Sequence, residues 1–178
     1  MKSKWLPILL IIWTAGLLLA VLYAASNKAK YFDPQNVLHQ SALSLSFDTV
    51  FVEALSKHKL ELAGSVIHFQ RSDCFCQTVA QSHINSVEKL AEKHQFNNVT
   101  VTLDGTSILK AFVPSVPAVA VIDKFGKLNY FGPYSSGMFC TEGDGLVEPF
   151  IEKDQLASSG ATVISQSQGC YCNLNRPS

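Results

Sequence analysis

The first apolar run of the chain is long enough to cross a membrane. Residues 5–25, WLPILLIIWTAGLLLAVLYAA, carry no charge, and a helix of about 20 such residues spans the hydrocarbon core of a bilayer. Trp5 and Tyr23 stand near its two ends, where interfacial aromatic rings tend to lie. A secretory signal has a shorter apolar core, and cleavage after Ala25 would put Tyr23 at a poorly tolerated position, although cleavage one residue later is an alternative. We therefore predict an uncleaved single-pass anchor, with its flanks, over residues 1–30.

Beyond the anchor, the pattern of apolar and polar positions predicts alternating helices and strands. Residues 31–46 contain Asp33-Pro34, which disfavours a helix, and we interpret them as a spacer. Helical or β-type spacing of apolar residues then predicts seven elements. They are a helix over 47–58, a strand over 64–70, a helix over 77–94, strands over 99–104, 118–123 and 127–132, and a helix over 145–156 that Pro149 weakens. This order predicts a small α/β sandwich over residues 47–156, followed by a tail over 157–178.

Two of these elements have particularly clear patterns. Ala80, Ile84, Val87 and Ala91 recur at the spacing of one helix face. AVAVID, residues 118–123, is almost continuously apolar, as expected of a central strand buried on both faces.

Charge argues against a nucleic-acid-binding surface. Four of the fourteen Lys and Arg residues lie in the first thirty residues, so the rest of the chain carries ten against fourteen Asp and Glu, a net charge of about −4. Nucleic-acid affinity depends largely on clustered Lys and Arg, and no basic run or Gly-rich phosphate loop is present. We predict no nucleic-acid partner and no cofactor.

The cysteines are the main candidates for chemistry. Four of the five form two Cys-aromatic-Cys pairs, CFC at Cys74 and Cys76 and CYC at Cys170 and Cys172, and Cys140 is the odd one out. Paired cysteines favour disulfide chemistry in an exported domain and metal or catalytic thiols in the cytosol. Lysines flank the anchor on both sides, so the positive-inside rule only slightly favours a cytoplasmic N-terminus. With the cysteines, this predicts a domain in the periplasm, held at the inner membrane through residues 5–25.

Three features resemble the thioredoxin superfamily. HFQRSDCFC places a cysteine pair where an apolar strand gives way to a helix, and SFDTVFVEAL occupies the place of the family's first helix. FVPSVPAVAVIDKFGKLNYFGPY is similar to the segment that carries the family's cis-proline, two hairpin strands and a glycine near the end of the second strand. The resemblance covers roughly residues 47–156 and implies a thioredoxin-like sandwich, a central mixed sheet flanked by helices. The anchor, CFC and the late GCYCN resemble a group of membrane-anchored bacterial thioredoxin-like proteins.

The resemblance assigns roles to individual residues. Pro117 matches the cis-proline, Val116 would contact a substrate chain through its backbone, and Gly132 matches the strand glycine. His68 stands where many members carry a buried acidic residue, so it is either a proton carrier for the inner thiol or a hydrogen-bonded core histidine. The other histidines, His39, His58, His83 and His94, are expected on the surface or on helix flanks.

A cysteine in the first turn of a helix faces free N–H groups, which favour its thiolate. Cys74 is therefore the expected exposed nucleophile and Cys76 its resolving thiol. One residue separates them instead of the usual two, which puts a standard reductase role in doubt. A bond between them would close a small, constrained ring and be readily reduced.

The tail cysteines leave three interpretations open. Cys170 and Cys172 are a second redox pair, or form structural disulfides with each other or with Cys140, or join Cys74 and Cys76 around one Zn²⁺ or Cu(I) ion. The leading hypothesis is a tethered thiol-disulfide oxidoreductase or isomerase that acts on protein thiols or disulfides. The alternatives are a copper- or zinc-binding, metallochaperone-like module that uses the two Cys-x-Cys pairs, and a non-catalytic thioredoxin-like interaction domain.

Overall fold

The computed structural model describes residues 5–26, 29–57, 62–104, 107–137, 145–152 and 160–174. Helix α1, Trp5–Ser26, packs against no other part of the described chain, and its window of highest hydropathy is fully exposed. It is the one helix among the described residues that is long and apolar enough to cross a membrane. The rest of the described chain forms a mixed α/β domain, as the sequence predicts.

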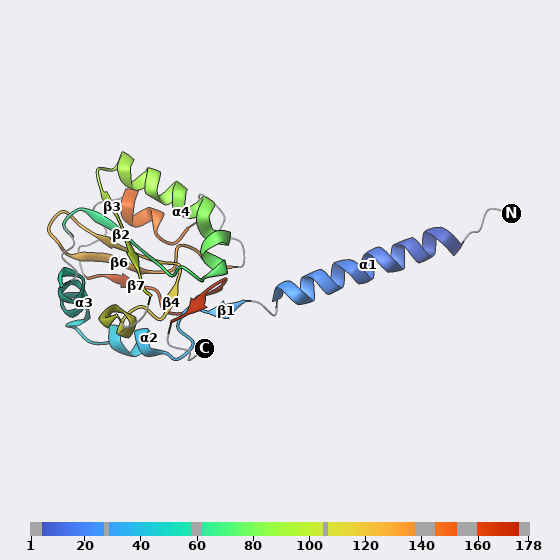
Figure 1. The fold of residues 1–178 in the computed structure, drawn as a ribbon, viewed down its shortest axis with the longest axis horizontal. Coiled ribbons are helices and arrows are strands. Elements are labelled where there is room, and N and C mark those ends of the chain that lie inside the picture. The colour runs from blue at the N-terminus through green and yellow to red at the C-terminus, as the bar shows by residue number, and fades with distance from the viewer. Residues whose placement is uncertain are drawn as a thin grey trace.

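The domain is built on a five-stranded mixed sheet with the order β3-β2-β5-β6-β7 (Figure 1). β2 and β3 are parallel, β5 lies antiparallel to β2 and β6, and β7 is parallel to β6. Helix α4, Phe75–Lys93, makes the crossover between the parallel pair. The strands are β2 (Ser65–Gln70), β3 (Asn97–Thr102), β5 (Ala118–Ile122), β6 (Leu128–Gly132) and β7 (Thr162–Val163).

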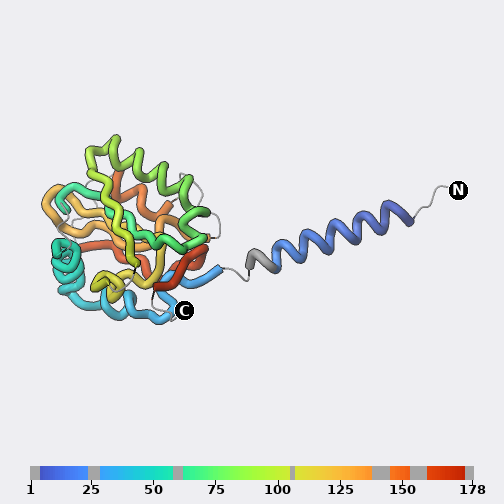
Figure 2. The backbone as a smooth tube through the Cα atoms, viewed as in Figure 1, coloured from blue at the N-terminus to red at the C-terminus, as the bar shows by residue number. Residues whose placement is uncertain are grey.

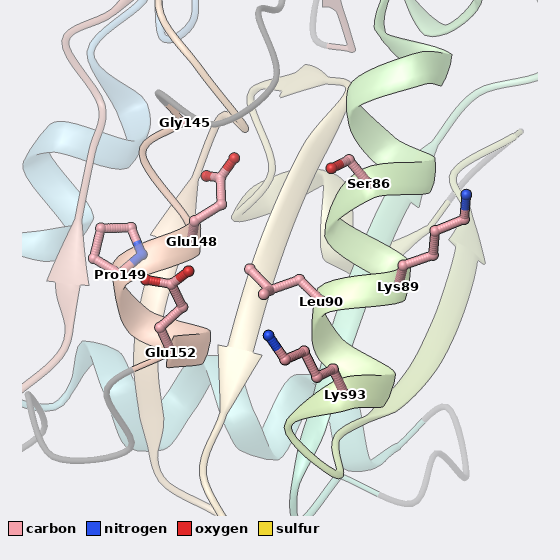
Figure 3. Close-up of a pocket in the computed structure, with 8 residues that line it drawn as sticks. All are labelled: Ser86, Lys89, Leu90, Lys93, Gly145, Glu148, Pro149 and Glu152. Atoms are coloured by element: carbon pink, nitrogen blue, oxygen red, sulfur yellow. The ribbon is translucent and has the colours of Figure 1, made fainter.

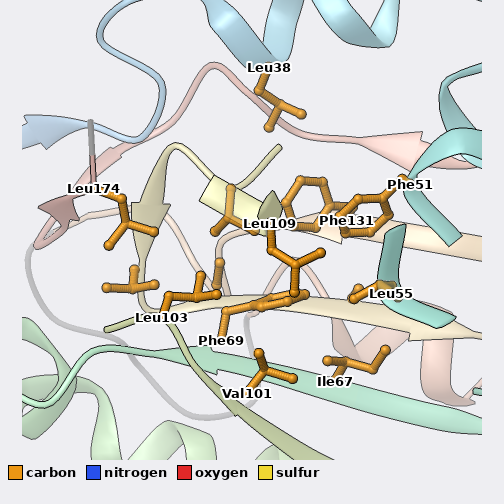
Figure 4. Packing of buried hydrophobic residues seen from close by; sticks show 14 of the residues in the cluster. Leu38, Phe51, Leu55, Ile67, Phe69, Val101, Leu103, Leu109, Phe131 and Leu174 are labelled. Atoms are coloured by element: carbon orange, nitrogen blue, oxygen red, sulfur yellow. The ribbon is translucent and has the colours of Figure 1, made fainter. Parts of the chain in front are cut away.

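Helices cover both faces of the sheet, and alternate strand residues form two cores. On one face the predicted α4 stripe packs with Val66, Val119 and Val121, and helix α5, Glu148–Glu152, adds Ile151. On the other face helix α3, Phe47–Ser56, packs with Ile67 and Phe69. Figure 4 shows this second core, in which the rings of Phe51 and Phe131 lie 4.6 Å apart between centroids. The predicted stripe of α4 is confirmed, since all four of its residues are buried.

Gly132 ends β6 at a point of close approach. A Cβ atom there would lie 3.0 Å from the carbonyl oxygen of Ile164, in the segment that follows β7. Only glycine lets the two segments approach this closely, which gives a physical reason for a glycine at this position.

The structure differs from the predicted spacer, because residues 31–46 are part of the fold. They contain the short helix α2, Val37–Ala42, and the side chains of Phe32 and Leu38 are fully buried. The carboxylate of Asp33 accepts hydrogen bonds from the backbone N–H groups of Val37 (3.0 Å) and His39 (2.8 Å). Asp33 thus stabilises the start of α2, so Asp33-Pro34 marks a helix start and not an unstructured linker.

The tail is also part of the domain. Strand β8, Gln168–Gly169, pairs antiparallel with β1, Lys30–Tyr31, which is the next element after α1. Strand β9, Cys172–Asn173, pairs antiparallel with β4, Ser115–Val116. Figure 2 shows the chain entering the domain beside its C-terminal segment. The two ends of the domain are therefore joined through backbone hydrogen bonds.

Two further differences concern helix α5 and a short helix that the sequence did not predict. Helix α5 begins three residues later than predicted, at Glu148, and the predicted helical residues 153–156 lie outside the described residues. A 3₁₀ helix, η1, occupies Ile108–Ala111 before β4 and has no counterpart in the sequence prediction.

Candidate functional site

The first cysteine pair lies at the start of α4. Cys74 is the N-cap residue, with an extended backbone, and the helix begins at Phe75. The preceding loop is held by Asp104, whose carboxylate accepts hydrogen bonds from the Ser72 hydroxyl (2.6 Å) and the Ser72 backbone N–H (3.3 Å). These bonds lower the pKa of Asp104 and keep it ionised. The loop that presents Cys74 is therefore fixed from a neighbouring segment.

The structure pairs the two Cys-aromatic-Cys motifs with each other. Cys74 is disulfide-bonded to Cys172, with Cα atoms 5.8 Å apart, and Cys76 to Cys170, with Cα atoms 5.3 Å apart. The first cysteine of CFC is thus joined to the second cysteine of CYC, and the second cysteine of CFC to the first of CYC. This pairing differs from the predicted bond between Cys74 and Cys76, and from the interpretation in which Cys170 and Cys172 bond to each other or to Cys140. Cys140 lies outside the described residues.

The structure also contradicts the prediction that Cys74 is exposed. Cys74 is buried, with 4% of its surface exposed, and belongs to the core between α3 and the sheet, the α3-side core. Cys76, Cys170 and Cys172 are each half-buried. The structure thus shows the sulfur expected to be the exposed nucleophile as the least accessible of the four. The Cys76–Cys170 disulfide thus joins two half-buried residues, whereas the Cys74–Cys172 disulfide joins a buried residue and a half-buried one.

The sulfurs form one compact group. The Sγ atoms of Cys74, Cys76 and Cys172 all lie within 4.8 Å of one another, and Cys170 is bonded to Cys76. A thiolate released at any of these positions therefore lies beside another sulfur.

Val116 and Pro117 lie directly beside this group. The peptide bond between them is cis, as the resemblance implies. The carbonyl oxygen of Val116 is 3.7 Å from the sulfur of Cys74, and Val116 is paired with Cys172 across β4 and β9. The backbone that the resemblance reserves for a substrate chain is thus occupied by the protein's own tail.

Polar contacts hold the tail on both sides of β9. The buried Tyr171 hydroxyl donates to the carbonyl oxygen of Ser135 (2.7 Å), and Leu174 N–H donates to the carbonyl oxygen of Pro114 (2.9 Å). Arg71 Nη1 donates to the carbonyl oxygen of Asn173 (3.3 Å), and its Nε pairs with Asp73. The tail therefore has noncovalent contacts that do not depend on its disulfides.

His68 lies in β2 as part of a buried polar network. Its Nδ1 is 2.6 Å from the Tyr134 hydroxyl and its Nε2 is 3.0 Å from Asn98 Oδ1. Both ring nitrogens thus have partners other than cysteine, as in a hydrogen-bonded core histidine, and the proton-carrier role stays a prediction. Burial lowers the pKa of His68, against smaller opposing effects of Asn98 and Glu88.

Acidification should therefore destabilise the protein through His68. The unfolded chain takes up a proton near the ordinary pKa of 6.5, whereas the folded protein resists it. The free energy of unfolding should fall as the pH drops below that value, by at most about 1.4 kcal/mol per pH unit. Denaturant titrations at several pH values measure the free energy of unfolding as a function of pH. In His68→Gln, the decrease that His68 causes at low pH should be absent. His94→Gln, at the partly exposed end of α4, should keep it. An unchanged slope in His68→Gln would contradict the assignment.

The prediction that His83 lies on the surface or on a helix flank is wrong, because its side chain is buried. It is fully buried on α4, and its Nε2 lies 2.6 Å from Glu148 Oε1 in α5. His83 lies beside Ile84 in the apolar stripe, and this position was the available signal for its burial. The pair links α4 to α5.

A hollow of about 560 Å³ lies between α4 and α5 (Figure 3). None of the cysteines that the structure describes lines it. Its charged lining residues are two lysines and two glutamates, which balance in charge and favour neither an anion nor a cation. The lining residues are Ser86, Lys89, Leu90, Lys93, Gly145, Glu148, Pro149 and Glu152.

Comparison with protein-family models gives a match. A family model described as "Domain of unknown function (DUF6436)" matches residues 44–174, most of the chain, and includes both cysteine pairs. No curated protein and no solved structure matches the chain.

Proposed function

The chain belongs to the DUF6436 family, and we propose that it is a membrane-tethered thiol-disulfide oxidoreductase that exchanges disulfides with protein thiols. The observation that carries the proposal is the group of four cysteines, in which two disulfides lie side by side and three sulfurs lie within 4.8 Å of one another. Disulfide exchange requires a thiolate to reach a neighbouring disulfide sulfur. This arrangement supplies such a neighbour at each step.

The accessible Cys76–Cys170 disulfide is the entry point. A thiolate of a substrate dithiol attacks the sulfur of Cys170, a half-buried residue, forms a mixed disulfide and releases Cys76 as a thiolate. The second substrate thiol, after losing its proton, attacks the substrate sulfur of that mixed disulfide and releases Cys170. The substrate loses two electrons and two protons and gains a disulfide, and the Cys76–Cys170 bond becomes two thiols. Alternatively, the Cys76 thiolate attacks Cys74 and releases Cys172, which moves the disulfide without net oxidation.

The start of α4 favours the thiolates that these steps release. Free N–H groups and the positive end of a 19-residue helix stabilise negative charge in the first turn. Cys76 is the second residue of that helix. Its thiolate is thus a good leaving group when an external thiol attacks the bond.

A thioredoxin-like fold remains part of the proposal. The strand-helix-strand unit, the following hairpin and the cis bond before Pro117 support it. The pairing of Val116 with Cys172 supports a substrate-like role for the tail, since the tail strand lies where the superfamily would hold a substrate chain. Val116 and Pro117 would then bind a substrate chain once the tail moves away.

The proposed location is the periplasmic side of the inner membrane, with α1 as a single-pass anchor. Two disulfides support an oxidising compartment. The length and apolar composition of α1 support the anchor.

The proposal is tested with the full chain in detergent micelles, in a Cys140→Ser background that removes the fifth thiol. Oxidised protein is mixed with reduced, unfolded lysozyme, and alkylation with mass spectrometry follows thiols on both molecules. Cys76 and Cys170 should become thiols as lysozyme gains disulfides. Cys76→Ala/Cys170→Ala should lower the rate to that of buffer. Cys74→Ala/Cys172→Ala, which removes the less accessible disulfide, should retain the first step.

Two results would contradict oxidoreductase activity. One is that lysozyme oxidation proceeds no faster with the wild-type chain than with buffer. The other is that both disulfides stay intact in a glutathione buffer that equilibrates catalytic disulfides. Either result would leave the disulfides as fixed links of a non-catalytic interaction domain.

A second candidate function is metal binding by the reduced cysteines. Three sulfurs within 4.8 Å of one another are close to the separation that Zn²⁺ imposes on thiolates about 2.3 Å from the ion. Cu(I) also favours such soft ligands. The reduced full chain, purified anaerobically, would then hold one Zn²⁺ or Cu(I) ion per chain and lose it in Cys172→Ser. Absence of bound metal would exclude this candidate.

A further inference from the structure

The strand that leaves the anchor leads directly to the disulfides. Lys30 is paired with Gly169 and Tyr31 with Gln168, and Phe32 N–H donates to the carbonyl oxygen of Ser167 (2.8 Å). Cys170 follows Gly169 in the chain and is bonded to Cys76 at the start of α4. The site is therefore linked to the anchor through one short strand pair.

Chain length limits how far the site can lie from a membrane. From Tyr23, at the end of the apolar span, three helical steps and four extended steps reach Lys30, roughly 19 Å at full extension. The strand pairing and one further residue add about 9 Å to reach Cys170. The disulfide thus lies within about 28 Å of the end of the span, in a region whose first 5 to 7 Å or so is lipid headgroups.

The pairing of β1 with β8 connects α1 to one end of the sheet and not to the other. Cys74 follows the C-terminal end of β2, and the β5–β6 turn with Phe125 lies beyond its N-terminal end, because Ser65 is paired with Ile122. Six strand residues separate these ends by about 20 Å. The end that carries the disulfides is the end to which the anchor strand is joined (Figure 1).

Exposed aromatic side chains flank the disulfides at this end. Tyr31 is 59% exposed beside β8, and Phe75, between the two cysteines of the first pair, is 74% exposed. Lys30 is exposed next to Tyr31. Aromatic rings concentrate at the membrane interface, and a lysine there can interact with lipid phosphates.

We propose that the end of the domain formed by Lys30, Tyr31 and Phe75 rests on the lipid bilayer, with the Cys76–Cys170 disulfide at the membrane surface. The inference rests on the membrane anchor of the proposed function. The bilayer is the occupant because the tether of residues 27–29 brings this end, and not the Phe125 end, to the lipid. An exchange partner of the disulfide would then be reached along the membrane plane.

The test uses tryptophan reporters in the full oxidised chain, reconstituted into phosphatidylcholine-phosphatidylglycerol vesicles. Trp5→Phe/Trp13→Phe removes both native tryptophans, and either Phe75→Trp or Phe125→Trp is added. These two sites are matched, since Phe75 and Phe125 are 74% and 76% exposed. Tryptophan emission is measured in vesicles whose acyl chains are brominated near the carboxyl group, where bromine quenches nearby tryptophan. This emission is then divided by the emission of the same variant in unbrominated vesicles. This ratio removes quenching by the neighbouring disulfides.

The fractional loss of emission should be several-fold larger for Phe75→Trp than for Phe125→Trp. Equal losses, or no loss in Phe75→Trp, would overturn the proposal. The unmodified chain tests separately whether α1 is inserted in the bilayer, because both of its tryptophans lie in α1. Quenching of those tryptophans together with an unquenched Phe75→Trp reporter leaves the anchor in place and refutes the docking. Unquenched native tryptophans refute the anchor and the docking together.

Discussion

Removing both disulfides should lower the free energy of unfolding by about 6 kcal/mol, whereas removing either one should lower it by only about 2 kcal/mol. Each disulfide closes a loop of nearly the same length, with sequence separations of 98 and 94 residues. Either bond alone therefore removes most of the loop-closure entropy of the unfolded chain. The second bond closes only a short additional ring and removes little more. Denaturant titrations of Cys74→Ala/Cys172→Ala, Cys76→Ala/Cys170→Ala and the fourfold variant measure the three values.

Additive losses in these variants would show that the disulfides do not close the same loop. The connectivity can be checked separately, because chymotrypsin cleaves after aromatic residues and Phe75 and Tyr171 each separate two cysteines. Peptides from the thiol-blocked, unreduced chain should join Cys74 to Cys172 and Cys76 to Cys170. The non-additivity also bears on the proposed function. One disulfide can open during exchange while the other still holds the tail on the domain.

Phe51→Ala should be the most damaging single substitution in the α3-side core, with a loss of about 3 to 5 kcal/mol. Phe51 is fully buried, and its ring lies 4.6 Å from that of Phe131 and 6.3 Å from that of Phe69, between centroids. Its removal would leave a cavity between α3 and the sheet that rigid aromatic neighbours cannot fill. Thermal or denaturant unfolding of the full chain in micelles measures the loss.

Phe125→Ala is the matched control, because it deletes the same side chain from an exposed turn. Its effect should lie within about 0.5 kcal/mol of zero. A Phe51→Ala loss as small as that of the control would contradict the packing described for this core.

The central part of the fold could be predicted because its elements carry periodic signals. The stripe from Ala80 to Ala91 fixes both the existence of α4 and its buried face, and the apolar run of β5 identifies a strand covered on both sides. These signals arise from burial that repeats along the element. They are strong because each element presents the same face to the core over several turns or residues.

The ends of the domain could not be predicted in the same way. Strands β1, β4, β8 and β9 have two residues each, too few to show a period. They are defined by partners more than fifty residues away, such as Cys172 for Val116. The spacer prediction failed for a local reason, because Asp33-Pro34 disfavours a helix at its own position while the Asp33 carboxylate stabilises α2 a few residues later.

The candidate site was predicted in its location but not in its connections. The position of CFC at the start of a helix was correct, since α4 begins at Phe75. The number and spacing of cysteines do not determine their pairing. The burial of Cys74 and the contact of His68 with Tyr134 both depend on how distant segments pack. The equal spacing of CFC and CYC was the available signal that the two motifs lie side by side.

The joining of β1 to β8 has a consequence for biogenesis. The segment that follows α1 finds its partner strand only when residues 168 and 169 have been synthesised. Until then the early strand edge stays open and the first two cysteines lack their mates. A ribosome that stalls before residue 168 would thus release a product whose folding cannot be completed, a natural target for quality-control proteases.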